Sequence, residues 1–434
     1  MGKIIEPPSR RVVITGLGVV APNGIGIEAF WQACILGRSG IGPITHFNAE
    51  RLPSRIAGEV DPFDLTQFHL TDEEIQQTDR ATRFALVAAQ QAIQDSKLSI
   101  ALPAIYERTG VIIGTALACS LEGEKYWTKL TDYGKHSPIV SSENVTLPPT
   151  LLMPHSAASS LAAHYHFHGP TTVIATGCSA GADAIGQAYW MIQDQQTDCM
   201  LAGGTDAGIT YGLFDAFCVM GALSTHYNDM PQQASRPYDG KRDGFVMAEG
   251  AGIVVLEERE HALARSAHIY AELIGFTSNN NAYHMVSLPT DGYPLQQLLQ
   301  QTLREAGITP QQIDYINSHG SSTRTNEVAE TKAYKTVFGA HAANIPISAT
   351  KSLIGHTQGA ASAIETIVTA LVLEHQQIPP TINQEQQDPA CDLDYVPNVA
   401  RKTTVNIALT HSSGFGGVNT ALLLMRPDWI RIAC

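Results

Sequence analysis

Charged side chains are scarce in this sequence. They make up 16% of its 434 residues, against about 25% in a typical soluble domain, so we expect an unusual share of the surface to be buried, for example by a partner. Asp and Glu (41) outnumber Lys and Arg (27), which gives a net charge of -14. Because a strongly acidic chain is repelled by nucleic acid and by anionic lipid, we do not expect bulk binding to either.

The sequence also lacks paired cysteines and long apolar runs. Its seven cysteines are scattered without a CxxC pair, which argues against a zinc site and against a disulfide framework, and we expect no metal. No run of about 18 apolar residues could span a membrane, and the first residues lack the apolar core of a signal peptide. We therefore expect a soluble protein in a reducing, cytoplasmic compartment.

Short runs rich in Val and Ile alternate with longer helical patterns along the chain. This alternation predicts an α/β fold, with a parallel or mixed sheet covered by helices on both faces. The length allows about three domains or one large duplicated body, and the charged, Ala-rich stretch 257–266 is a plausible seam. The predicted strands are 12–16, 110–114, 172–176, 200–204, 253–257, 269–275, 313–318, 345–349, 405–410 and 420–425.

A glycine-rich segment near the N-terminus, residues 16–21, matches a loosened dinucleotide-binding fingerprint, G-x-G-x-x-A. Pro22 and Asn23 then force a turn where the fingerprint needs a helix to begin. No acidic residue follows at the spacing that would hold a ribose. We interpret the segment as a tight turn and expect no nucleotide cofactor.

The most informative segment, residues 171–190, joins a β-branched strand to a helical pattern through Gly177-Cys178-Ser179-Ala180-Gly181. The side chain at such a turn lies at a helix N-terminus, where free N–H groups and the helix dipole favour an anion. Cys178 would there be a nucleophilic thiolate near neutral pH. Two alternatives stay open: the same residues match G-x-S-x-G, the elbow of a serine hydrolase that would use Ser179, and Cys178 can be a small core residue.

Two histidines downstream share one context, because each follows a predicted strand and has glycine beside it. His319 and His356 lie in loops where α/β proteins place their sites, although a structural hydrogen bond is the ordinary role of one such histidine. Lys351, five residues before His356, favours a catalytic role for these histidines. The helical pattern 359–374 places His356 before a helix whose positive end keeps imidazole neutral, which suits stabilisation of an oxyanion. Glu330, on the helical stretch 326–338, is a candidate partner that would hold Lys351 charged.

The last glycine-rich segment, residues 411–417, follows the predicted strand 405–410. Its backbone N–H groups could be offered to an oxyanion. The alternative is a plain hairpin turn into the last strand.

Together these segments resemble the β-ketoacyl-acyl-carrier-protein synthases, condensing enzymes of the thiolase fold. The motifs occur in family order: the cysteine elbow, the H-G-x-x-T loop that begins at His319, the T-K-S-x-x-G-H loop at 350–356 and the G-F-G-G loop at 414–417. The resemblance covers nearly the whole chain. It implies a duplicated, five-layered α-β-α-β-α body with mixed sheets, whose halves, 1–258 and 259–434, carry the cysteine and the two histidines respectively.

The resemblance also implies residue roles. Cys178, His319 and His356 would form the catalytic triad, and Lys351 and Glu330 a supporting pair. The other implied roles are an oxyanion hole from the backbone N–H groups of Cys178 and Phe415, a gate at Phe415, and a phosphopantetheine tunnel along Ser321 and Thr323. Substrates would be carried on the phosphopantetheine arm of an acyl carrier protein, without a metal or a free cofactor.

Within the family, the sequence resembles the ketosynthase α subunit of type II aromatic polyketide synthases. The signals are T-G-C-S-A-G at 176–181, Ser321-Ser322, and S-S-G-F at 412–415, where Ser413 replaces an aromatic residue and should loosen the gate. Glu327 replaces the usual Asp of its segment. The implied reaction is decarboxylative condensation of malonyl-carrier protein with an acyl or poly-β-ketoacyl chain on Cys178, in a heterodimer with a chain-length-factor paralogue. A fatty-acid-elongating synthase II homodimer and a non-catalytic chain-length subunit are the alternatives.

The acidic net charge makes carrier-protein docking a problem, because acyl carrier proteins are themselves acidic and would be repelled at long range. We therefore expect docking on a local basic patch, with Arg80 and Arg83 as candidates.

Overall fold

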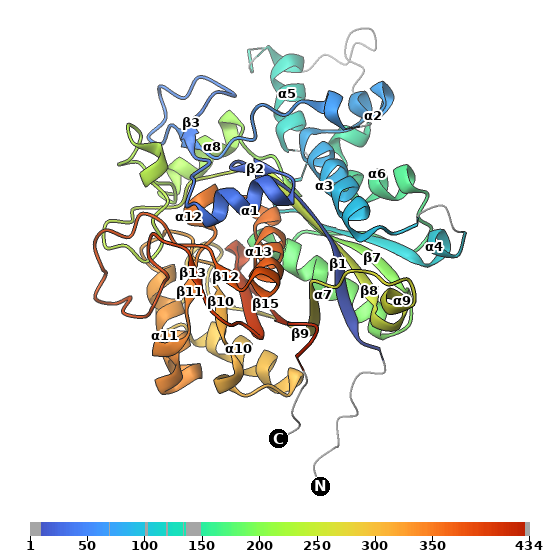
Figure 1. Ribbon diagram of the computed structural model, residues 1–434. Helices are drawn as coiled ribbons and strands as arrows, with labels where there is room; N and C mark the ends of the chain where they lie inside the picture. The colour runs from blue at the N-terminus through green and yellow to red at the C-terminus, as the bar shows by residue number, and fades with distance from the viewer. Residues whose placement is uncertain are drawn as a thin grey trace.

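Figure 1 shows the computed structural model, which describes residues 10–68, 70–99, 103–118, 120–132, 134–135 and 149–429. The main strands fall into two sets, one from each half of the chain. The first set comprises β1 (Val12–Ala21), β5 (Thr109–Gly114), β6 (Thr171–Ile174), β7 (Cys199–Asp206) and β8 (Gly250–Glu258). The second set comprises β9 (Ala271–Asn280), β10 (Tyr315–Asn317), β11 (Ile347–Ser348), β14 (Ile407–Ser413) and β15 (Val418–Met425).

The two sets have the same topology. Their spatial orders are β6-β5-β7-β8-β1 and β11-β10-β14-β15-β9, so in each set the third strand lies at one edge and the first at the other. Directions match as well: β6, β5 and β7 are parallel, as are β11, β10 and β14, and the remaining neighbours are antiparallel. The first strands of the two sets, β1 and β9, pair antiparallel through Val12 and Leu273, which joins both sets into one sheet. The repeated order confirms the duplicated mixed-sheet fold.

Helices complete the layers. α7 and α13 lie between the two sets of strands, and each contacts strands of both. α3 and α6 cover the outer face of the first set, while α10, with α11 packed on it, covers the outer face of the second, on the opposite side of the molecule in Figure 1. The helices are α1 (Ile27–Ile35), α2 (Asp72–Gln77), α3 (Arg80–Ser96), α4 (Pro103–Arg108), α5 (Ser120–Thr131), α6 (Ser156–Tyr165), α7 (Ala180–Gln193), α8 (Tyr211–Val219), α9 (Arg259–Ala264), α10 (Tyr293–Ala306), α11 (Asn326–Phe338), α12 (Lys351–Ile354) and α13 (Ala361–His375). Short strand pairs complete the fold: β2 (Gly24–Ile25) on β1, β3 (Gly42–Pro43) with β4 (Ile56–Ala57), and β12 (Gln377–Ile378) with β13 (Arg401–Lys402).

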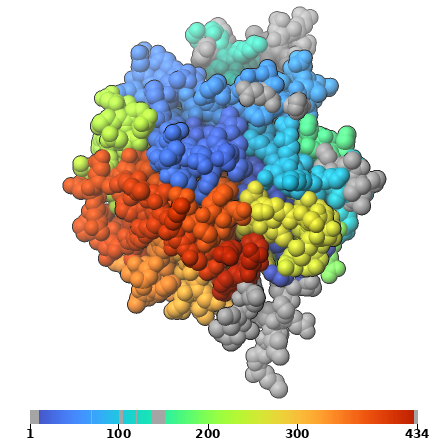
Figure 2. All heavy atoms as spheres, viewed as in Figure 1, coloured from blue at the N-terminus to red at the C-terminus, as the bar shows by residue number. Residues whose placement is uncertain are grey.

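The halves share one hydrophobic core. A single cluster of buried side chains includes Ile14 and Ile185 from the first half and Phe276, Ile364 and Leu422 from the second. Figure 2 shows atoms of the first half (blue) directly against those of the second half (orange and red). β8 ends at Glu258 and α9 follows at once, inside the expected seam, but the division at 258/259 into two domains stays a prediction.

All ten predicted strands are present, with ends that differ by a few residues. The tight-turn prediction for residues 16–21 is wrong, because β1 continues through them to Ala21. Gly16 and Gly18 are required for another reason: a Cβ on either would lie 2.2 Å from the carbonyl oxygen of Ala92 or 1.8 Å from that of Ala88, both on α3. These glycines allow the helix to pack directly on the strand. No helix in the described part of the chain is both long and apolar enough to span a membrane.

The contact between α7 and α13 depends on Gly181, whose added Cβ would lie 2.8 Å from both the backbone nitrogen and the Cβ of Ala363. We expect Gly181→Ala to lower the free energy of unfolding by about 1–3 kcal/mol, because the added methyl group would overpack the contact between two buried helices. Gly123→Ala is the matched control, since Gly123 lies inside helix α5 with its nearest neighbour 4.0 Å away, and it should be neutral or stabilising by about 0.5–1 kcal/mol. Thermal unfolding of both variants checks this; equal shifts would contradict close packing at Gly181.

Candidate active site

Cys178 lies on a sharp turn between a strand and a buried helix. β6 ends at Ile174, one 3-10 turn (Gly177–Ser179) follows, and α7 begins at Ala180. Gly177 has a φ of 61°, in the left-handed region that glycine adopts without strain, and so permits the reversal. The side chain of Cys178 is thereby held, buried, at the N-terminal end of α7, as the sequence predicts.

Ser179 is turned away from any catalytic group. Its hydroxyl is fully buried and donates to the carbonyl oxygens of Ser412 (3.3 Å) and Val418 (3.0 Å). A hydroxyl that donates to two backbone carbonyls, with no histidine contact recorded in the described residues, lacks the base that a serine nucleophile needs. The geometry therefore opposes the serine-hydrolase alternative.

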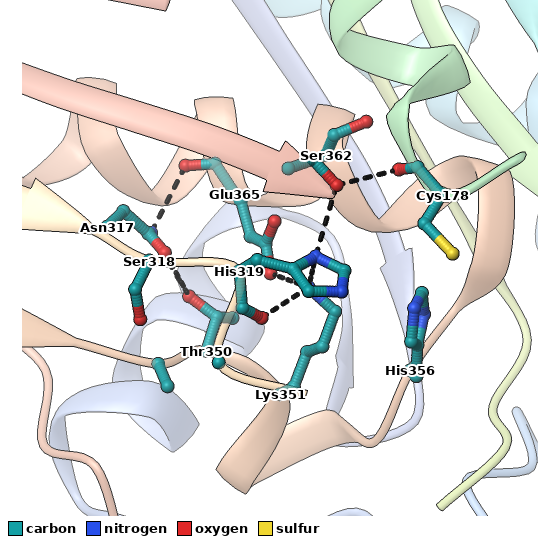
Figure 3. Close-up of polar contacts among 12 residues, drawn as sticks. Cys178, Asn317, Ser318, His319, Thr350, Lys351, His356, Ser362 and Glu365 are labelled. Atoms are coloured by element: carbon teal, nitrogen blue, oxygen red, sulfur yellow. Dashed lines mark hydrogen bonds and ion pairs between the residues drawn. The ribbon is translucent and has the colours of Figure 1, made fainter. Parts of the chain in front are cut away.

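Cys178, His319 and His356 line one cavity of about 550 Å³. His319 follows β10, and His356 follows the short helix α12. The two imidazole rings lie with their centroids 5.3 Å apart and their planes at 76°. Figure 3 shows the sulfur of Cys178 and both rings facing a common space. The structure thus brings together the three residues predicted as the triad.

Hydrogen bonds and burial keep both histidines neutral. The backbone N–H of Gln358 donates to Nδ1 of His356 (3.1 Å), and the ammonium of Lys351 lies 3.2 Å from Nδ1 of His319. When Nδ1 accepts in this way, the neutral ring carries its proton on Nε2. Burial, reinforced by the charge of Lys351, holds the pKa of both imidazoles well below the ordinary value. Each ring can therefore offer an N–H to a developing oxyanion.

Lys351 is paired with Glu365, not with Glu330 as the sequence analysis proposes. The ammonium nitrogen lies 2.5 Å from Oε1 of Glu365 on α13 and also donates to the carbonyl oxygen of His319 (2.8 Å). Both charged groups are almost completely buried. Burial raises the pKa of Glu365 to about 7, and the adjacent ammonium opposes that rise. The direct ion pair of Lys351 is thus with Glu365, whereas Glu330 feels the charge of Lys351 from a greater distance, where it opposes the rise in the Glu330 pKa caused by burial.

Glu330 has different partners. Its carboxylate accepts from the hydroxyl of Tyr238 (2.5 Å) and from the backbone N–H of Gly320 (3.2 Å), the residue after His319. Burial raises the pKa of Glu330. Glu327, one turn earlier on α11, accepts from the N–H of Ser322 (2.5 Å). Both acids thus support the backbone of the loop that carries His319.

Phe415 comes close to Cys178 from the other half of the chain. Its backbone N–H donates to the sulfur of Cys178, and Gly414 passes so near that an added Cβ would lie 3.0 Å from the Cys178 nitrogen. Ser412 reinforces this junction by donating to the Cys178 carbonyl (3.0 Å). The ring of Phe415 stacks on Phe217, with centroids 6.1 Å apart. The two N–H groups proposed for an oxyanion hole therefore lie side by side.

The thiol of Cys178 is not acidic in the resting protein, which corrects the expectation of a ready thiolate. Burial raises its pKa to about 11, although the charge of Lys351 and the N–H of Phe415 both oppose the rise. The sequence pattern shows the helix N-terminus but does not show how completely the sulfur is removed from water. The thiol proton must therefore leave as the sulfur attacks, and the sulfur of the departing thioester group can take it up.

Of the remaining predicted residues, Ser321 and Thr323 line the cavity, with their hydroxyl oxygens 2.9 Å apart. The side chains of Arg80 and Arg83 form contacts within the protein. Arg80 forms an ion pair with buried Glu249 (2.6 Å), and Arg83 donates to backbone carbonyl oxygens. Their docking role stays a prediction, and these internal contacts disfavour it.

A buried aspartate that the sequence analysis does not single out ties the site together. The carboxylate of Asp206, at the end of β7, accepts from the hydroxyl of Thr115 and from the N–H groups of Ala116, Leu117 and Gly359, at 2.6 to 3.0 Å. Burial raises its pKa to about 6 against these four hydrogen bonds. Because Gly359 follows Gln358, which donates to His356, Asp206 holds the loop that orients that ring.

Two more residues are absent from the predicted set: Glu365 and Ser412. A signal for Glu365 exists, since it is the one charged residue within the otherwise uncharged stretch 361–373 of α13. Ser412 has no such signal, because its contacts with Cys178 and His319 join distant parts of the chain.

Comparison with known proteins identifies the family of the chain. The family models described as "Beta-ketoacyl synthase, N-terminal domain" and "C-terminal domain" match residues 9–262 and 270–385. The chain therefore belongs to the β-ketoacyl synthase family. It is 42% identical to the 3-oxoacyl-[acyl-carrier-protein] synthase 2 of Synechocystis sp., over 95% of this chain and 97% of that protein.

Polyketide enzymes are as similar. The tetracenomycin polyketide synthase ketoacyl synthase alpha subunit of Streptomyces glaucescens is 42% identical over 97% of this chain and 98% of its own length. A solved type II polyketide ketosynthase structure, "AntDE:AntF", in complex with its acyl-carrier protein, superposes with a TM-score of 0.90 at 39% identity. That comparison covers 98% of this chain and 100% of the other.

We expect Cys178 to react slowly with iodoacetamide at neutral pH, because a thiol with a pKa near 11 is almost wholly protonated there. The rate should rise about tenfold per pH unit between pH 7 and 9, following the thiolate fraction. Stopped labelling followed by peptide mass analysis measures this rate at Cys178. A rate that levels off below pH 8 would contradict the raised pKa.

We expect Glu365→Gln to cost about 3–5 kcal/mol of unfolding free energy, because it leaves the buried Lys351 ammonium without its counter-charge. Glu330→Gln should cost less, about 1–2 kcal/mol, because no lysine or arginine among the described residues lies within 4 Å of the carboxylate it replaces, and the imidazole of His411, at 3.9 Å, is kept neutral by burial. Urea unfolding of both variants compares them. Equal losses, or a larger loss at Glu330, would contradict the assignment of Glu365 as the partner of Lys351.

Proposed function

We propose that the protein is a condensing enzyme that joins a malonyl unit, with loss of CO₂, to an acyl or poly-β-ketoacyl chain held on Cys178. The observation that carries this proposal is the placement of Cys178, two neutral histidines and two backbone N–H groups around one cavity. The substrates are thioesters on the phosphopantetheine arm of an acyl carrier protein, and the hydroxyls of Ser321 and Thr323 lie where they can bind that arm.

In the first step, the sulfur of Cys178 attacks the thioester carbonyl of the incoming acyl group. The N–H groups of Cys178 and Phe415 stabilise the tetrahedral oxyanion, an effect worth roughly 10² to 10³ in rate per donor. The bond between the acyl carbon and the carrier sulfur breaks, the carrier thiol leaves with the proton that Cys178 gives up, and the acyl group stays on the Cys178 sulfur.

In the second step, malonyl-carrier protein occupies the cavity and its C–CO₂ bond breaks. The electron pair of that bond forms an enolate whose oxygen accepts hydrogen bonds from Nε2–H of His319 and His356. The enolate carbon attacks the acyl carbon on Cys178, a carbon–carbon bond forms, and the Cys178 sulfur leaves as a thiolate that takes a proton from water. Lys351 contributes by keeping Nδ1 of His319 an acceptor.

The edge of the sheet indicates where a partner chain can bind. β6 pairs with β5 alone among the described strands, and Thr171 and Thr172 on it are exposed. A free edge of this kind is suited to pairing with a strand of another chain. We propose a chain-length-factor paralogue as this second chain; a second copy of the same chain, in a fatty-acid-elongating synthase II homodimer, is the alternative. We place the enzyme in the cytoplasm, in keeping with its free cysteines.

Two features favour the polyketide assignment. Ser413, in place of an aromatic residue, lines the cavity beside Phe415 and leaves room for a bulky chain. The presence of Cys178 disfavours a non-catalytic chain-length subunit, because such a subunit has no use for the nucleophile.

The decisive test has two parts. Treatment with an acyl thioester should add the acyl mass to the wild type and to Ser179→Ala but not to Cys178→Ala, as read by intact mass spectrometry. With carrier protein and malonyl units, the chain should make poly-β-ketone products only when the paralogue is added. Full-rate elongation of saturated chains by the chain alone, as a homodimer, would contradict the polyketide assignment and leave the fatty-acid alternative.

A further inference from the structure

The side chain of Gln358 lies in the catalytic cavity but takes part in none of the steps of the proposed reaction. Gln358 lines the same cavity as Cys178 and His356 and is 3% exposed. The turn that it begins, Gln358–Ala360, packs against the turn Gly177–Ser179 that carries Cys178. Its side chain therefore belongs to the wall of the cavity near the nucleophile.

The backbone of Gln358 has an unfavourable conformation for its residue type. Its φ is 53°, in the left-handed region that a residue other than glycine adopts only at a cost in energy. Glycine would have no such cost, and the chain has glycine nearby at positions 355 and 359. Strained residues of this kind are concentrated in functional sites. The glutamine side chain therefore needs a reason of its own at this position.

The amide of Gln358 is only partly hydrogen-bonded. One N–H of Nε2 donates to the carbonyl oxygen of His356 (3.3 Å), which fixes the direction in which the amide faces. Among the described residues, no donor is recorded for Oε1 and no acceptor for the second N–H of Nε2. A buried amide is costly unless both of its groups find partners. A ligand in the cavity can supply the missing ones.

We propose that the amide of Gln358 binds the β-keto oxygen of the chain held on Cys178, and so selects β-ketoacyl chains over saturated ones. The proposal rests on the proposed function and names the substrate class of the same site. The β-keto oxygen accepts from the second N–H of Nε2, and the enol form of the same unit can donate to Oε1. A saturated chain offers neither group and leaves the amide unpaired, which is how a polar site rejects an apolar analogue.

The test compares acylation of Cys178 by acetoacetyl-pantetheine and by butyryl-pantetheine, four-carbon thioesters that differ only in the β-keto oxygen. Gln358→Met keeps the length of the side chain and removes the amide. We expect it to lower the acetoacetyl rate by about tenfold relative to the butyryl rate, because one hydrogen bond to the substrate is lost, while the butyryl rate itself does not fall. Intact mass spectrometry over time gives both rate constants.

Thr225→Val is the matched control, because it removes a hydroxyl from another residue that lines the cavity. It should leave the ratio of the two rates unchanged. An unchanged ratio in Gln358→Met, or an equal fall in both rates, would overturn the proposal, since a purely structural amide affects both substrates alike. Gln358→Leu repeats the comparison if Gln358→Met does not fold, as read by thermal unfolding, and unfolding of both variants would assign the amide to the fold and overturn the proposal. If neither thioester acylates Cys178 in the wild type, the proposed function itself fails.

Discussion

One buried positive charge sets the chemistry of the site. The ammonium of Lys351, 1% exposed, is held by Glu365, by the carbonyl of His319 and by Nδ1 of the same histidine. Burial lowers the pKa of His319, His356 and His411, and the charge of Lys351 lowers it further. The same charge opposes the rise that burial causes in the pKa of Cys178. A buried cation is costly unless it is paired, so Glu365 is as necessary to the site as the lysine. The histidines stay neutral because they are buried, and this fixed charge beside them reinforces the effect.

The site exists only where the two halves meet. Cys178 comes from the first half, yet its carbonyl and its sulfur are both held by residues of β14 and the loop after it. In the opposite direction, Asp206 of the first half holds Gly359 of the second, and Ser362 on α13 accepts from the N–H of Ala182 near the start of α7. These contacts join the shared core to the cavity. A shift of one half relative to the other would therefore separate the nucleophile from the histidines.

The sequence predicts the strands and the triad because their signals are local: β-branched runs, and glycines beside a cysteine or histidine. The sequence does not predict the features that depend on tertiary contacts. The pattern around Gly16 indicates a turn, although glycine is required there because α3 packs closely against the strand. The partner of Lys351 depends on how α13 packs against α12, which no spacing along the chain reveals. The pattern shows that Cys178 lies at a helix N-terminus, but it does not show that the sulfur is buried, and burial raises the pKa of the thiol.

The few charged residues of the chain are used largely for ion pairs within the fold. Many arginines form internal ion pairs, such as Arg236 with Asp239, Arg242 with Asp388 and Arg265 with Glu257. Few cations are then left near the site, and Arg324 is the only arginine or lysine among the described residues that line the cavity. Much of the positive charge therefore stabilises the fold itself, and long-range attraction contributes little at the cavity lining.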